Sequence, residues 1–159
     1  MPATPAPTTQ KVGTARLAEL IDARLACIRN VNALSRKQLE LIKNKEMVDL
    51  TALLERKQKT FKLLEQVERA LDPFRDEEPE DRVWESQQLR EETAAKISEC
   101  EELLRETFER DKESEEMLSE SRDEAAQKLR GLAAAGPAKN AYIEDQKPGD
   151  SHGHLNFDA

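Results

Sequence analysis

Residues 80–135 decide the fold: EDRVWESQQLREETAAKISECEELLRETFERDKESEEMLSESRDEAAQKLRGLAAA. This stretch contains no proline and a single glycine, Gly131. At about 1.5 Å per residue, an unbroken helix of this length would span roughly 80 Å. Its apolar residues recur at steps of three and four over 94–108, which is typical of a helix packed against other helices. We predict one long helix that needs partners along one stripe.

Two helices are predicted to precede it. Apolar residues recur at helical period over 14–44, with Thr14 as a candidate N-cap, and again over 46–72. Glu46 stands in the first turn of the second helix, where the helix dipole favours an acid. Asn44 is expected to end the first helix, because Asn tolerates the left-handed cap conformation. The short connection predicts an antiparallel hairpin.

Two features of the hairpin bear on its core. Lys57 interrupts the apolar series of the second helix. Either its stem packs while the ammonium reaches water, or it makes a buried polar contact that fixes the register. Pro73 and Pro79 bracket a polar loop, PFRDEEP. Phe74 and Trp84, near its two ends, are expected to cap the end of the bundle, with a ligand platform at Trp84 as the alternative.

The predicted fold class is all-α, an antiparallel helical hairpin plus a long third helix, with a disordered tail at each end. Charged residues make up 36% of the chain and aromatic residues 4%, which favours a helical bundle over a sandwich. Three prolines within the first seven residues predict a disordered lead over 1–13. The helical domain is expected over 14–135. Gly136–Pro137 then begin a polar tail, 136–159, that is also predicted to be disordered.

Helix lengths predict which part of the third helix lacks a partner. A second helix of roughly 26 residues can pair with a similar length of the third, 80–106. Residues 107–135 are therefore expected to extend past the hairpin turn. Segment 109–124 contains only Met117 and Leu118 as apolar residues, and a lone helix of that kind is marginal in water.

The charges are unevenly distributed along the chain. Residues 1–75 hold 14 Lys and Arg against 9 Asp and Glu, whereas residues 76–124 hold 7 against 20, within a net charge of −8. An acidic third helix against a basic hairpin is helped by this complementarity, although exposed pairs contribute less than about 1 kcal/mol each. No basic stripe with interleaved aromatic residues occurs, so nucleic acid is not an expected partner.

The sequence offers no residues for catalysis, a cofactor or a metal. A di-iron bundle needs Glu-x-x-His on facing helices, but both histidines, His152 and His154, stand in the tail. The expected register puts Cys27 and Cys100 roughly 16 Å apart, and a disulfide needs Cα atoms within about 7 Å. Both are interpreted as reduced thiols in the seams between helices. Without an apolar run of about 18 residues or a secretory signal, the chain is expected to be cytoplasmic.

The hairpin sequence LIKNKEMVDLTALLERKQKTFKLLEQV, 41–67, resembles the FlgN family of flagellar export chaperones. The family pattern is a short turn with an acidic residue, then Leu-x-x-Leu-Leu-x-x-Lys, then further Leu. The matching residues are Glu46, Leu50, Leu53, Leu54 and Lys57. NVNALSRKQLELI upstream and ECEELLRETFERDKESEEMLSESRDEAAQKLRGL downstream fit the same plan, as does a Tyr after the last helix. The resemblance covers about residues 14–143.

This resemblance implies a cytosolic, non-enzymatic chaperone of type III flagellar protein export. Such a chaperone binds the C-terminal helical region of the hook–filament junction proteins, prevents their premature assembly and delivers them to the export gate. Cargo would supply the missing partner helix and order a marginal segment, at a cost in affinity that permits release. Tyr142 would contact the gate. The expected cargo-binding residues are Phe108, Met117, Leu118, Ala125, Leu129 and Leu132.

Two other interpretations stay open at this point. The first is a coiled-coil homodimer or scaffold, in which residues 107–135 pair with the same segment of a second copy. The second is a sister chaperone of the same export system that binds the filament cap protein, since both kinds of chaperone are short helical hairpins with a C-terminal helix.

Overall fold

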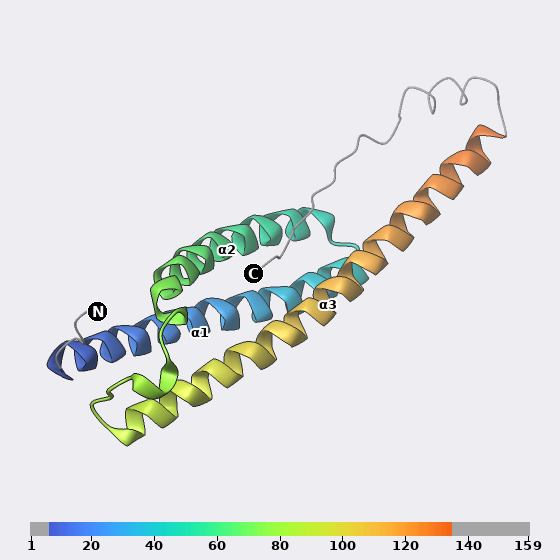
Figure 1. The fold of residues 1–159 in the computed structure, drawn as a ribbon. Coiled ribbons are helices and arrows are strands. Elements are labelled where there is room, and N and C mark those ends of the chain that lie inside the picture. Colours follow the sequence, from blue (N-terminus) through green and yellow to red (C-terminus); the bar gives the residue numbers. More distant parts are fainter. Residues whose placement is uncertain (1–6, 135–159) are drawn as a thin grey trace. The chain divides into compact units, whose positions relative to one another are not determined.

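The computed structural model describes residues 7–134, which contain three α-helices, one short 3₁₀ helix and no strand (Figure 1). In chain order they are α1 (Pro7–Lys43), α2 (Met47–Arg75), η1 (Pro79–Asp81) and α3 (Gln87–Ala133). The all-α fold class is confirmed. The chain divides into two compact units, Met1–Met117 and Leu118–Ala159, and α3 contributes residues to both. Each unit is described by itself.

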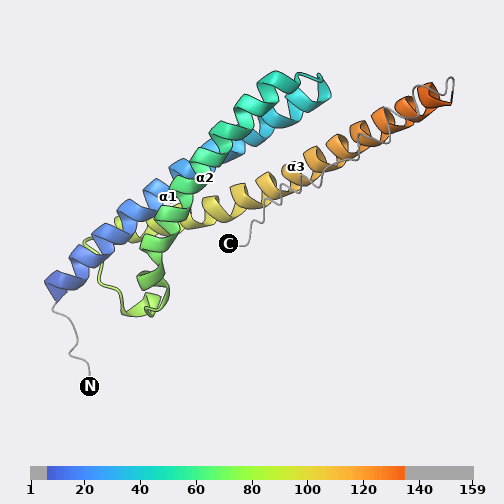
Figure 2. The ribbon, with the colours of Figure 1, turned by 90° about the horizontal axis from the view of Figure 1, so that it is seen from above.

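The turn between α1 and α2 closes the predicted hairpin. The Glu46 N–H donates to the Leu41 carbonyl at 2.9 Å and the Lys45 N–H to the Ile42 carbonyl at 3.1 Å, the bond pair of a Schellman motif. Lys45 has a φ of 58°. The prediction that Asn44 takes the left-handed position is therefore wrong by one residue. Figure 2 shows α2 returning beside α1 from the turn, while the first part of α1 reaches past the end of α2.

Helix α1 begins at Pro7, so the prediction of a disordered lead over 1–13 is wrong for 7–13. Proline is tolerated in the first turn of a helix, because the first N–H groups have no partner within the helix. Thr14 is consequently an internal residue and not an N-cap. Its hydroxyl donates to the Val83 carbonyl at 2.7 Å, which ties α1 to the segment before α3.

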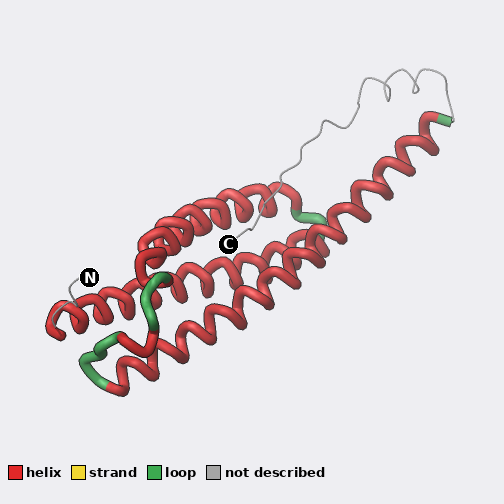
Figure 3. Tube along the Cα trace, viewed as in Figure 1, coloured by secondary structure: helices red, strands yellow, loops and turns green. Residues whose placement is uncertain are grey.

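The loop between α2 and α3 is displaced toward the C-terminus relative to the prediction. Helix α2 runs through Pro73 and ends at Arg75. Pro79 then starts η1, and α3 begins only at Gln87, seven residues later than expected (Figure 3). The Leu89 N–H donates to the Ser86 hydroxyl at 3.1 Å, so Ser86 caps the helix. The acids after Pro79 belong to the short helix and not to α3.

The bundle of the first unit has an apolar end, where α1 starts and α2 finishes. Its buried residues are Leu17, Leu20, Ile21 and Leu71. Val67, Ala70, Phe74, Trp84 and Ile97 pack against them. The predicted position of Phe74 and Trp84 at the end of the bundle is confirmed. All three helices therefore share one apolar cluster here.

The register between α1 and α3 differs from the prediction. Cys100 packs against Leu25 and Ile28, whereas the expected register placed it level with about residue 38. The ion pair between Arg29 and Glu99, 2.8 Å between Nη2 and Oε1, sets the same register. Starting α1 earlier and α3 later shifts the pairing by about ten residues. Cys27 and Cys100 are both free, and Cys27 is half-buried. Cys27 stands in the sequence between Leu25 and Ile28, the two residues of α1 that cluster with Cys100. The predicted offset between the two cysteines along the helix axes is therefore wrong.

The new register also extends the covered part of α3. Thr107 and Ser114 are buried, and Asp111 contacts α2. The expectation that α3 loses its partners after residue 106 is therefore wrong, and the first unit reaches Met117.

Candidate functional site

A buried polar network joins all three helices of the first unit. The Lys57 ammonium on α2 donates to both carboxylate oxygens of Asp111 on α3, each at 2.7 Å, and to Oε1 of Gln38 on α1 at 2.8 Å. The side chain of Lys57 is 3% exposed and that of Asp111 is 14% exposed. The ammonium also lies 5.9 Å from the centroid of the Phe61 ring. Lys57 thus has a protein partner for its charge in place of water.

This network decides between the two interpretations of Lys57. The stem does not carry the ammonium to solvent, and the buried polar contact is the one found. Burial lowers the pKa of Lys57, while the hydrogen bond and charge of Asp111 act in the opposite direction. The sequence signal for the network was Lys57 itself, at a position of an otherwise apolar series. The partner Asp111 carried no signal, because it stands among many acids.

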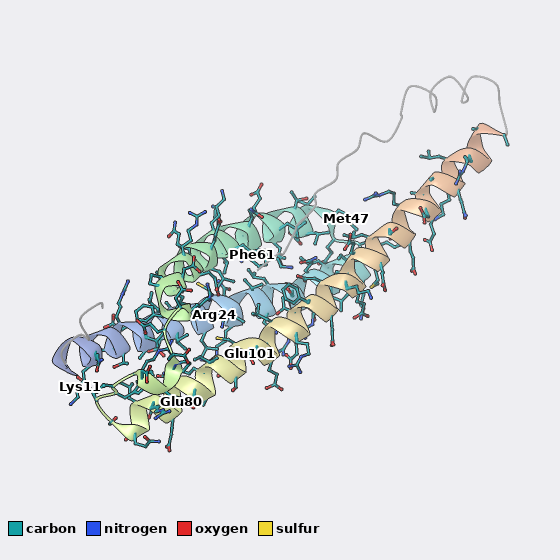
Figure 4. The ribbon with its side chains drawn as sticks, viewed as in Figure 1. Lys11, Arg24, Met47, Phe61, Glu80 and Glu101 are labelled. Carbon is teal, nitrogen blue, oxygen red and sulfur yellow. The ribbon has the colours of Figure 1, made fainter. Side chains whose placement is uncertain are left out.

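Further polar contacts lie in the same half of the bundle. The Asn32 amide on α1 donates to the Thr107 hydroxyl at 3.2 Å and to the Leu103 carbonyl at 3.3 Å. Asn30 donates to the Thr60 hydroxyl at 3.2 Å, which joins α1 to α2. The hydroxyls of Ser35 and Ser114 are buried without a hydrogen-bond partner. Figure 4 draws the side chains of the three helices as sticks, with Arg24 of α1, Phe61 of α2 and Glu101 of α3 among those labelled. This half of the interior therefore combines directional bonds with buried apolar side chains, which are Val31, Leu41, Ile42, Leu50 and Leu53.

An ion pair and a thiol occupy the middle of the bundle. Arg24 on α1 bonds Glu68 on α2, and both side chains are largely buried. The Arg24 guanidinium is close enough to Cys100 to act on its thiol. Burial raises the pKa of the Cys100 thiol, and Arg24 partly offsets that rise. Burial likewise raises the pKa of Cys27. A raised pKa makes a thiol less nucleophilic near neutral pH, because the thiolate is the reactive form.

The structure divides the six predicted cargo-binding residues between the two units. Phe108 and Met117 belong to the first unit, where Phe108 is 41% exposed and Met117 is half-buried. The other four belong to the second unit. Between 118 and 132 every side chain is exposed or half-buried, and Leu129 and Leu132 are 44% and 53% exposed. The described part of the second unit thus has no interior of its own along this stretch.

Leu118, Ala125, Leu129 and Leu132 form one stripe of α3, named here the terminal stripe. At about 100° per residue, these four positions fall within a sector of roughly 60°. Met117 is about 100° away from Leu118 on the same helix and does not belong to that face. Four of the six predicted residues therefore share one face of α3 within the second unit.

Other predicted positions lie outside the described residues. Tyr142, His152 and His154 are among them. Within residues 7–134, no group of three or more His, Cys, Asp or Glu side chains is arranged to hold a metal ion. None of the described helices is long and apolar enough to cross a membrane.

Comparison of the chain with models of protein families, with curated proteins and with solved structures finds no match.

Proposed function

We propose that this chain is a non-enzymatic, cytoplasmic chaperone of flagellar type III export, similar to the FlgN family. It binds the C-terminal helical region of hook–filament junction proteins, prevents their premature assembly and delivers them to the export gate. The sequence support is the resemblance over 41–67. The structural support is an antiparallel hairpin followed by a long third helix.

The observation that carries the proposal is the terminal stripe. Its leucines lie on one face of α3, in a stretch where no side chain is buried. An amphipathic helix of a partner binds such a face through apolar residues spaced by three, four and seven. Covering Leu129 and Leu132 removes apolar surface from water at about 25 cal/mol per Å². The surface fits a helix better than it fits a small molecule, because it is a linear stripe.

Two aspartates in the stripe test the proposal. Leu118→Asp with Leu129→Asp is expected to weaken binding of a junction-protein C-terminal peptide at least tenfold, since charges then face the apolar side of the peptide. Calorimetric titration measures the affinity. The melting temperature of the first unit should stay the same, because both residues belong to the second unit.

The matched control introduces the same two charges away from the stripe. Ser119→Asp with Gln127→Asp alters exposed residues of the same segment, about 100° and 180° from Leu118. This variant should bind the peptide as the parent chain does. Equal binding by both double variants would show that the stripe is not the binding surface.

Two further comparisons address the partner. A peptide from the filament cap protein, titrated in parallel, distinguishes the junction-protein chaperone from its sister chaperone. Tyr142→Ala should weaken capture by the export gate while leaving the peptide affinity unchanged, because the proposal gives Tyr142 the gate contact alone.

A further inference from the structure

The outer face of α2 is basic and carries exposed apolar side chains. At about 100° per residue, it occupies a sector of roughly 120° on the side away from the buried residues of that helix. Val48 is 86% exposed and Leu63 is 55% exposed. Glu55 is the one carboxylate that we place in this sector. The basic and apolar members, all exposed, are Val48, Ala52, Arg56, Lys59, Lys62 and Leu63.

The three cations of this face have no partner within the described chain. The ion pairs of residues 7–134 involve neither Arg56 nor Lys59 nor Lys62. By contrast, Arg69, two turns further along the same helix, is paired with Glu65 at 2.6 Å. Unpaired positive charge beside exposed apolar side chains is suited to an acidic partner surface.

The first unit carries a matching acidic face on α3. Glu102, Glu109, Glu113 and Glu116 fall within a sector of about 60°, on the side of α3 opposite the buried Cys100. All four are exposed, and none belongs to an ion pair of the described residues. At about 1.5 Å per residue, the acidic row spans roughly 21 Å and the α2 face roughly 22 Å. The two faces match in sign and in length.

We propose that the outer face of α2 in one copy of the chain binds the acidic face of α3 in a second copy. Every copy carries both faces, so two such contacts can close a dimer about a two-fold axis. A nucleic acid or an anionic membrane is a less suitable partner, because the chain as a whole has a net charge of −8. The contact covers Val48 and Leu63 as well as pairing the charges. It uses neither the terminal stripe nor the bound cargo of the proposed function.

Salt dependence of self-association is the first test. Sedimentation equilibrium of the full chain should detect a dimer at about 0.05 M NaCl, with a dissociation constant at least tenfold higher at about 0.5 M, since the screening length falls from more than 10 Å to less than 8 Å. A single monomeric species at all concentrations in low salt would overturn the proposal. So would a dimer whose affinity ignores salt.

Charge reversal identifies the faces. Arg56→Glu, Lys59→Glu and Lys62→Glu together should abolish the dimer, as should Glu109→Lys, Glu113→Lys and Glu116→Lys together. Mixing the two triple variants should restore association, because each reversed face then meets a face of opposite sign. All six residues are exposed, so circular dichroism should show unchanged helicity. Failure of the mixture to associate would overturn the assignment of these two faces.

Two controls separate the proposal from its alternatives. Lys11→Glu, Arg16→Glu and Arg36→Glu make the same change in net charge on exposed residues of α1 and should leave the dimer intact. Leu118→Asp with Leu129→Asp should also leave it intact, whereas loss of the dimer there would favour a coiled coil of the terminal segment. Binding of the parent chain to phosphatidylserine vesicles, lost on reversal of the α2 face while the chain stays monomeric, would assign that face to a membrane and overturn the proposal.

Discussion

The two ends of the bundle in the first unit hold the same three helices together by different means. At the apolar end, Leu17, Leu20, Ile21 and Leu71 are covered by Phe74, Trp84 and Ile97. At the polar end, which also buries Leu41, Ile42, Leu50 and Leu53, the Lys57 ammonium joins Gln38 on α1 to Asp111 on α3. Apolar contact is non-directional and tolerates small shifts. A buried ion pair is directional, so we expect the network at the polar end to specify the register of the helices and the apolar end to contribute affinity between them.

The largest expected effect comes from removing one partner at the polar end. Asp111→Ala should lower the free energy of unfolding by about 3–5 kcal/mol, because Lys57 would remain buried without a counter-charge. Urea denaturation measures the loss. Asp22→Ala is the control, since it breaks an exposed α1–α3 ion pair with Lys96 and should cost less than about 1 kcal/mol. Equal losses in the two variants would contradict the comparison.

Truncation at the apolar end should have a somewhat smaller effect. Ile21→Ala removes buried methyl groups from the cluster around Leu71 and is expected to cost about 3 kcal/mol. Measured by the same denaturation, Leu63→Ala on the exposed surface should change stability by less than about 0.5 kcal/mol. A cost for Ile21→Ala as small as that for Leu63→Ala would mean that this cluster is not the apolar core.

Replacing the whole network sharpens the comparison further. Gln38→Leu, Lys57→Met and Asp111→Leu together should be neutral or stabilising by about 1–2 kcal/mol, since no buried charge is left unpaired. If the network specifies register, amide hydrogen exchange over 104–117 should become faster or heterogeneous even though global stability is kept. Unchanged, uniform protection there would show that apolar packing alone sets the register of α3.

The smallest effect is expected at the hairpin turn. Lys45 has a left-handed backbone, which costs a residue with a side chain roughly 1 kcal/mol. Glycine removes that strain but loses more entropy on folding. Lys45→Gly should therefore raise the unfolding free energy by only about 0.5 kcal/mol in thermal or urea denaturation. Asn44→Gly, one position earlier and not left-handed, should be neutral or destabilising.

The helices and the turn could be predicted because local patterns encode them. Apolar residues that recur every three or four positions predicted all three helices, and the polar residues around Asn44 predicted the position of the turn. The ends were less predictable. Pro7 begins a helix because the first turn tolerates it, and Ser86 caps α3 although Pro79 and the acids after it formed the stronger signal.

The register and the network could not be predicted in the same way. Register depends on where α1 and α3 begin. The predicted starts of these two helices were each wrong by seven residues, so every predicted pairing between them was displaced, including the one that involves Cys100. Lys57 was visible as an exception to a pattern, but its partner was one of 33 Asp and Glu in the chain. Of the candidate site, helix periodicity supports the terminal stripe and excludes Met117 from it. The identity of a binding partner is not encoded in local sequence pattern.

The separation of Lys57 from Asp111 has a consequence for the order of events during synthesis. The two residues are 54 positions apart, so Lys57 is synthesised well before the carboxylate that pairs with it. At a synthesis rate of about 5–20 residues per second, Asp111 is added roughly 3–10 seconds after Lys57. During that interval its ammonium stays hydrated, because removing an unpaired charge from water is costly. The Lys57 ammonium can lose its water only when α3 brings Asp111 beside it.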